Sequence, residues 1–235
     1  MRRLWNRPAS TATSHWQRGG SDRTLFGPMI DQSFSKIVDS LAQRTPTPGG
    51  GAAAAMAACM GAALLLMVVR FSRGKKATAE RDGDLARVEG LLQEHLLRLM
   101  PMAERDCASF DLVSKAYAMP KATEEEQAMR NRAIQEAMIG AMVVPEETLC
   151  MVRDVSVAMA GVIDCVGKNI CSDLASGSAL LVAAGEGAQL NVRINAAYLD
   201  DRELANGAAM RAKTLVAEIH QNHKAINARV EALLA

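Results

Sequence analysis

Three consecutive glycines, Gly49, Gly50 and Gly51, are the residues whose placement most directly suggests chemistry. They open a segment, residues 50–69, that carries no charged side chain and has the composition of a helix. The free backbone N–H groups at a helix N-terminus attract anions, so this turn is a candidate ligand site. Glycines also allow backbones to pack closely, and from the residues alone both interpretations stay open.

Other matches to known motifs lack the neighbouring elements or residues that the function of those motifs requires. The glycine spacing at residues 49–54 matches a dinucleotide fingerprint, but no strand precedes it. The Arg-Gly-Lys-Lys run at 73–76 lacks the first glycine and the Ser/Thr of a phosphate loop. His220 and His223 share a helix face without an evident third ligand, and neither HExxH nor GxSxG occurs. We therefore expect no metal site.

The elements that must hold such a site are predicted to be helices. The chain has 235 residues, only 3% aromatic side chains, and few alternating runs of β-branched residues, which nearly excludes an all-β fold. The 27 basic and 26 acidic side chains give a net charge of +1, which argues against a nucleic-acid partner. These features predict an all-α protein.

The cysteines indicate the compartment. Five cysteines occur at scattered spacings without a CxxC pair, which is typical of reduced thiols in a cytoplasmic protein that serve as packing residues. They are Cys59, Cys107, Cys150, Cys165 and Cys171.

The uncharged segment is long enough to span a bilayer, yet we expect it to be buried among other helices and not in a membrane. Its many alanines would contribute little to insertion, whereas small side chains let neighbouring helices approach. Together with a long last helix at 201–234, it favours an elongated bundle that completes its core in a homodimer.

Local signals predict where the helices begin and end. Asp31 is expected to cap a short first helix, and Asp200 to cap the last one. Thr123 and Glu126 have the spacing of a capping box. Pro101 should kink or divide one helix, and Pro145 should end one helix and begin the next.

Residues 1–28 differ from the rest of the chain. They are rich in Ser, Thr, Gly and Arg, lack a helical apolar stripe, and lack the apolar core of a signal peptide. We interpret them as a disordered or misassigned N-terminal extension, with Met29 as the natural start. The helical domain is expected to cover residues 29–235.

Several motifs in register resemble the cyclodeaminase/cyclohydrolase family of folate enzymes, over about residues 30 to 232. They include the runs at 46–51, 74–76, 106–111, 119–126, 144–145, 172–173 and 188–195, with Arg130 and Gln135 between them. The resemblance implies an all-helical, dimeric protein whose folate site lies near the glycine-rich turn. The length from Met29 is similar to that of the stand-alone methenyltetrahydrofolate cyclohydrolases.

The resemblance also implies a set of site residues. Asp106 stands at the position of the family's catalytic Asp and would act as the general base that activates water. Asp173 and Asn191 are candidates for orienting groups, and Asn195 is a candidate for contact with the substrate. Lys75, Lys76 and Lys121 could pair with the carboxylates of a glutamate tail, and Gly49, Gly50 and Gly51 would contact the substrate. No cofactor beyond the tetrahydrofolate substrate is expected.

Two alternatives remain. The same site could serve a cyclodeaminase, which releases ammonia from a formimino-folate. The chain could also be an inactive helical scaffold, because it departs from the family pattern at Ala52, Ala77, Gly167 and Glu146.

Overall fold

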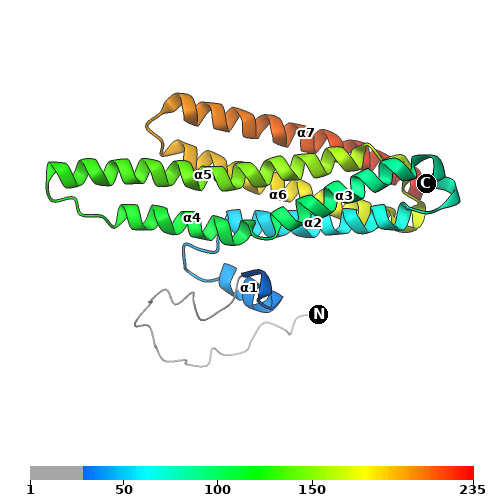
Figure 1. Ribbon diagram of the computed structural model, residues 1–235, viewed down its shortest axis with the longest axis horizontal. Helices are drawn as coiled ribbons and strands as arrows, with labels where there is room; N and C mark the ends of the chain where they lie inside the picture. The colour runs from blue at the N-terminus through cyan, green and yellow to red at the C-terminus, as the bar shows by residue number, and fades with distance from the viewer. Residues whose placement is uncertain (1–28) are drawn as a thin grey trace, which may run out of the picture.

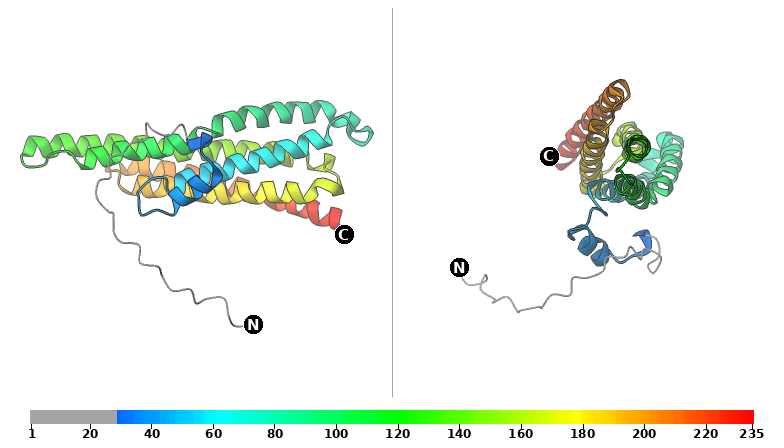
Figure 2. Two further views of the ribbon diagram at one scale, coloured as in Figure 1. Left: turned by 90° about the horizontal axis from the view of Figure 1, so that it is seen from below. Right: turned by 90° about the vertical axis from the view of Figure 1, so that its left-hand side faces the viewer.

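The computed structural model describes residues 29–235, and the predicted extension at 1–28 lies outside the described residues. Residues 29–235 form helices and no strand, which confirms the predicted all-α class. The helices lie side by side in an elongated bundle, with α1 set apart from its body (Figures 1 and 2). In chain order they are η2 (Met29–Asp31), α1 (Phe34–Leu41), α2 (Gly50–Ser72), η3 (Lys76–Arg81), α3 (Asp82–Leu99), α4 (Met102–Tyr117), α5 (Glu124–Ala160), η4 (Ile163–Cys165), η5 (Lys168–Ile170), α6 (Cys171–Ala197) and α7 (Arg202–Leu234).

The uncharged helix α2 packs along α6 and also contacts α3, α4 and α5. By length and composition alone α2 could cross a membrane. However, 56% of its most apolar stretch of 18 residues is buried inside the bundle. The two helices are antiparallel, because Gly61 faces Gly177 while Gly50 lies near Asn191. A side chain at Gly61 would meet Leu181 and the backbone of Gly177, so the small residues allow the close approach that was predicted.

The helix starts follow the usual capping chemistry. The capping box is confirmed: Glu126 N–H donates to Thr123 Oγ1 at 3.1 Å, and Thr123 N–H donates to Glu126 Oε2 at 3.2 Å. The two acidic caps were each predicted slightly too early. Asp201, and not Asp200, caps α7.

The first helix is capped by Ser33 and not by Asp31, which falls in the preceding 3-10 turn. Pro101 lies between α3 and α4, so of the two predicted outcomes, a kink or a division of the helix, the division is confirmed. The prediction that a helix ends before Pro145 is wrong, because α5 runs through it without a break.

A side chain from α6 explains how α5 tolerates that proline. Pro145 has no backbone N–H, so the carbonyl of Ala141, four residues earlier, loses its helical donor. Asn195 Nδ2 donates to this carbonyl at 2.9 Å and replaces the missing hydrogen bond. Asn195 was predicted to contact substrate, and here it ties α6 to α5.

Two other residues of the family motifs hold connections in place. Gln135 donates to the Tyr198 carbonyl at 3.1 Å and accepts from the Asp200 N–H at 2.8 Å, which fixes the turn between α6 and α7. Arg130 donates to the Tyr117 carbonyl at the end of α4, at 3.1 Å. All five cysteines are free thiols, and three of them are buried.

Candidate active site

The glycine turn forms the start of α2. Gly49 is the N-cap and has no side chain to offer, so the first N–H groups of the helix need acceptors from elsewhere. The turn follows a proline-rich loop in which the Thr47–Pro48 peptide bond is cis. Gly50 is exposed, whereas Gly51 and Ala52 are buried.

Asp106, in the second turn of α4, supplies the missing cap. Its carboxylate accepts a hydrogen bond from the Ala52 N–H, the position that an N-cap side chain normally satisfies. The carboxyl group lies so close to Gly51 that a Cβ built there would overlap it. Glycine at position 51 is therefore what allows α4 to bring Asp106 onto the end of α2.

Two opposing influences set the charge state of Asp106. Burial raises the pKa of its carboxyl group, while the hydrogen bond from Ala52 lowers it, and burial is the larger effect. The positive end of the α2 dipole also favours the anion. A half-buried carboxylate with a raised pKa beside free N–H groups has the properties of a general base.

Asn191, from α6, lies on the other side of the turn. Its Nδ2 is 3.4 Å from the position of a Cβ on Gly50, and it donates to the Gly187 carbonyl at 2.8 Å. That bond leaves the amide oxygen of Asn191 as an acceptor. Helices α2, α4 and α6 thus bring the glycine turn, Asp106 and Asn191 together.

The remaining predicted site residues lie elsewhere in a single copy of the chain. Lys75 and Lys76 follow the far end of α2, which at ~1.5 Å per residue is roughly 33 Å from Gly50. Asp173 belongs to the first turn of α6, one turn before Gly177, and so lies toward that same far end. Lys121 is exposed in the connection between α4 and α5, at the opposite end of the bundle (Figure 1).

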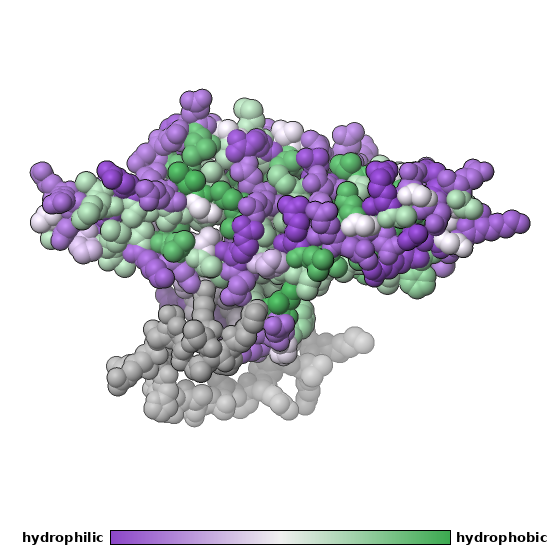
Figure 3. Space-filling view, viewed as in Figure 1, coloured by the Kyte–Doolittle hydropathy of each residue, from purple (hydrophilic) through white to green (hydrophobic). Residues whose placement is uncertain are grey.

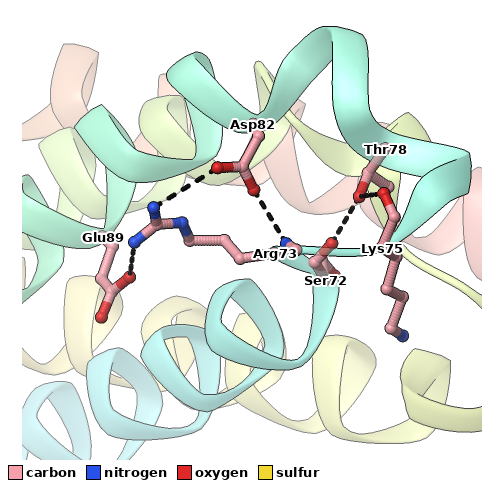
Figure 4. Close-up of polar contacts among 7 residues, drawn as sticks. Ser72, Arg73, Lys75, Thr78, Asp82 and Glu89 are labelled. Atoms are coloured by element: carbon pink, nitrogen blue, oxygen red, sulfur yellow. Dashed lines mark hydrogen bonds and ion pairs between the residues drawn. The ribbon is translucent and has the colours of Figure 1, made fainter.

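The turn that carries Lys75 has a structural explanation. Arg73 bridges Glu89 at 2.7 Å and Asp82 at 3.4 Å, and the Gly74 N–H donates to Asp82 at 2.9 Å. Figure 4 shows these bonds closing the corner between α2 and α3, with the Lys75 side chain pointing away from them. Gly74 has a φ of 66°, which glycine adopts without strain.

No group of three or more His, Cys, Asp or Glu side chains suited to a metal ion occurs in residues 29–235. A carboxylate does lie near one of the two histidines of the last helix, which the sequence did not indicate: His220 Nε2 is 3.0 Å from Glu186 of α6. His223 Nδ1 is 2.8 Å from the buried Ser178 Oγ, and its Nε2 is 2.9 Å from Asn227.

One participant was missed in the sequence. Ala52 contributes through its backbone N–H, which no side-chain pattern reveals. The signal was available in the triple glycine, because an N-cap without a side chain leaves a donor that another helix must satisfy.

Comparisons with known proteins agree with this architecture. The model of the formiminotransferase-cyclodeaminase family matches residues 33–214. A methenyltetrahydrofolate cyclohydrolase of Methylorubrum extorquens is 37% identical over 195 residues, which cover 80% of this chain and 90% of that protein. A formimidoyltransferase-cyclodeaminase of Gallus gallus is 30% identical over 216 residues, or 92% of this chain, although these span only 39% of that longer protein.

A solved structure has the same fold. The crystal structure of a formiminotetrahydrofolate cyclodeaminase from Thermotoga maritima superposes with a TM-score of 0.77 and 26% identity, covering 87% of this chain and 98% of that one. The family match spans well over half of the chain, and the bundle agrees with it. The chain belongs to the formiminotransferase-cyclodeaminase family.

Proposed function

We propose that this protein hydrolyses 5,10-methenyltetrahydrofolate to 10-formyltetrahydrofolate, with Asp106 as the general base. The observation that carries the proposal is the contact of the Asp106 carboxylate with Gly51 and the Ala52 N–H. It fixes a basic group beside the open start of α2. The 37% identity to a cyclohydrolase over most of both chains favours this substrate among those of the family.

The chemistry suits a single carboxylate. The methenyl bridge of the substrate is part of an amidinium-like cation, which a nearby anion stabilises. Asp106 takes a proton from water as the water oxygen bonds to the bridging carbon, and general-base help of this kind is typically worth 10²–10⁴-fold. The bond from N5 to that carbon then breaks, N5 gains a proton, and the formyl group stays on N10. One proton is released overall.

Substrate contacts follow from the same geometry. The exposed Gly50 leaves room beside the turn, and the amide oxygen of Asn191 offers an acceptor to the ring N–H groups of a folate. Lys75, Lys76 and Lys121 remain predicted contacts for the carboxylates of a glutamate tail, and because they lie at the ends of the bundle they are suited to an extended tail or to a substrate bound to a second copy of the chain. Asp173 remains a predicted orienting group, although in a single copy it lies toward the far end of α2.

Cyclodeaminase activity is the second candidate, favoured by the fold match to the Thermotoga maritima protein. There N10 would attack the formimino carbon and ammonia would leave, with Asp106 receiving the proton of N10. Both reactions form or open the same ring, so one site could hold either substrate.

An inactive scaffold is less well supported. Ala52 departs from the family pattern in its side chain only, and the site uses its backbone N–H. Glu146, another departure, is paired with Arg211 at 2.7 Å on the surface between α5 and α7. We further propose that the protein is a cytoplasmic homodimer with no cofactor beyond its tetrahydrofolate substrate.

Two assays on the same purified protein separate these functions. The absorbance of methenyltetrahydrofolate should disappear faster than its spontaneous hydrolysis if the protein is a cyclohydrolase. Ammonia release from formiminotetrahydrofolate would identify a cyclodeaminase. Turnover of neither substrate, with no folate binding, would establish the scaffold.

A further inference from the structure

An apolar groove separates α1 from the body of the bundle. Its volume is about 730 Å³, which is within the usual range of small-molecule pockets. Helix α1 contributes Phe34 and Ile37 to the lining, and α2 contributes Met56 and Met60. Figure 3 shows apolar side chains gathered where α1 meets the bundle. The groove is therefore suited to the apolar part of a ligand.

One end of this groove adjoins the candidate active site. Met56 lies one helical turn after Ala52 on α2, and Ala103, which also lines the groove, lies one turn before Asp106 on α4. The Ala52 N–H and the Asp106 carboxylate are in contact. Helices α2 and α4 thus bring the groove to one side of the proposed general base.

An aromatic side chain lies on the other side of Asp106. Phe110 follows Asp106 by four residues on α4, so the two share a face of the helix, about 6 Å apart along its axis. Long side chains in a helix lean toward its N-terminus, which directs the ring of Phe110 toward Asp106. Because Asp106 meets Gly51 in the first turn of α2, the next turn of α4 lies beyond the start of α2, and the Phe110 side chain is 36% exposed there.

The two sides of Asp106 differ in polarity. The ionisable side chain in the lining of the groove is Glu104, and this carboxylate already accepts the Met29 N–H at 2.9 Å. On the side of Phe110, Asn191 lies near Gly50, and its bond to the Gly187 carbonyl leaves its amide oxygen as an acceptor. An apolar ring therefore suits the groove, whereas a ring with N–H groups on its edge suits the side of Phe110 and Asn191.

The proposed substrate has its two ring systems arranged in the same way. Its methenyl carbon joins N5 of the pterin to N10, and N10 carries the benzene ring of the p-aminobenzoyl group, so the rings lie on opposite sides of the reacting carbon. The pterin has N–H groups on its edge, whereas the edge of the benzene ring is apolar. We infer that the p-aminobenzoyl ring binds in the groove and that the pterin stacks on Phe110, within reach of Asn191. The inference rests on the folate substrate of the proposed function.

Calorimetric titration of the full chain with three compounds tests this orientation without any turnover. The compounds are 5-formyltetrahydrofolate, which has both ring systems, 6-hydroxymethylpterin, and p-aminobenzoylglutamate. Phe110→Ala should raise the dissociation constants of the first two by roughly 10-fold or more, the usual effect of losing one stacked ring, and leave the third unchanged. Met60→Trp, which fills the groove, should weaken 5-formyltetrahydrofolate and p-aminobenzoylglutamate and leave 6-hydroxymethylpterin unchanged.

Each variant has a matched control. Phe71→Ala, at a 54% exposed position near the far end of α2, and Met210→Trp, at a 70% exposed position on α7, should bind all three compounds as the wild type does. Phe110→Leu keeps an apolar side chain but lacks the ring, so it should repeat the pattern of Phe110→Ala with the melting temperature of the wild type. In turnover, Phe110→Leu should raise KM and leave kcat within a few-fold, because Asp106 stays in place.

Three results would overturn the inference. Phe110→Leu and Phe110→Ala could bind 5-formyltetrahydrofolate as tightly as the wild type, or Met60→Trp could do so. The two fragments could respond in the reverse order, which would place the pterin in the groove. The controls could also lose affinity as strongly as the site variants. A protein with the expected binding pattern that does not hydrolyse methenyltetrahydrofolate would refute the proposed reaction alone, whereas a hydrolase with unaltered binding in all variants would refute the orientation alone.

Discussion

The carboxyl group of Asp106 occupies the space in which a side chain at Gly51 would begin. One residue lies in the second turn of α4 and the other in the first turn of α2, and the Ala52 N–H completes the contact. The contact gives the glycine turn a structural role in addition to the substrate contact that we propose for it. It lets a charged group from another helix cap α2 and stay within reach of the site.

Replacement of Gly51 by alanine should therefore displace Asp106. The new Cβ would overlap the carboxyl group, so the Asp106 side chain would have to move away from Gly51 and from the Ala52 N–H, whose hydrogen bond it accepts. We expect kcat/KM to fall about as far as in Asp106→Ala. Gly90→Ala, where a Cβ meets nothing within 4 Å, is the control and should keep full activity. A Gly51→Ala enzyme with normal turnover would show that the close contact is dispensable.

The pH profile should report the raised pKa of Asp106. As a general base it must be ionised, so kcat/KM should fall as pH drops through a pKa above the ordinary value for Asp. Asp106→Asn should abolish this acid limb. A profile in which the residual activity of Asp106→Asn keeps the same limb would assign the titration to another group.

The effect of Asp106→Asn on the stability of the fold also has a definite direction. A carboxyl group whose pKa is raised by folding destabilises the native state above its unfolded pKa, and this penalty is relieved as pH falls through the folded pKa. Asp106→Asn should thus melt no lower than wild type at pH 7, with its relative advantage lost at low pH. Thermal unfolding of both proteins from pH 7 to pH 4 measures this difference. A large loss of stability at pH 7 would mean that the hydrogen bond from the Ala52 N–H to Asp106 stabilises the fold by more than the burial of the charge destabilises it.

Much of the fold could be predicted because its signals are local. The uncharged run, the capping box at Thr123 and the division at Pro101 each depend on a few neighbouring residues. The continuation of α5 through Pro145 could not be predicted, since it depends on Asn195, which is 50 positions away in the sequence. The candidate site divides in the same way. The triple glycine indicates a helix start, and the family resemblance selected Asp106, but the hydrogen bond from the Ala52 N–H to this carboxylate is visible only in the fold.

The pairing of Asn195 with Pro145 can be tested by a double-mutant cycle. Asn195→Ala should leave the Ala141 carbonyl without a donor, at a cost of roughly 1–3 kcal/mol of unfolding free energy. In a Pro145→Ala background, the restored N–H should bond that carbonyl, so the same substitution should cost less. Denaturant unfolding of the four proteins measures the coupling. Equal costs in both backgrounds would contradict the assignment.

His223 should make the contact between α6 and α7 sensitive to acid. Burial lowers the pKa of its imidazole, with a smaller contribution from His220. Because the folded state favours the neutral imidazole, His223 contributes stability at any pH above its pKa in the unfolded chain. This stability is lost as the pH falls through the lower pKa that His223 has in the folded protein. His223→Gln should unfold with a shallower dependence between pH 7 and pH 5. An unchanged dependence would show that other groups carry it.

The central claim is that Asp106 activates water, and the absorbance assay of methenyltetrahydrofolate with Asp106→Asn tests it most directly. The substitution keeps the shape and an oxygen acceptor for the Ala52 N–H but removes charge and basicity. With the spontaneous reaction subtracted, the rate should fall by about two to four orders of magnitude, while folate binding and helical circular dichroism stay close to wild type. Near-normal turnover by the folded variant would contradict the account and remove Asp106 from the mechanism.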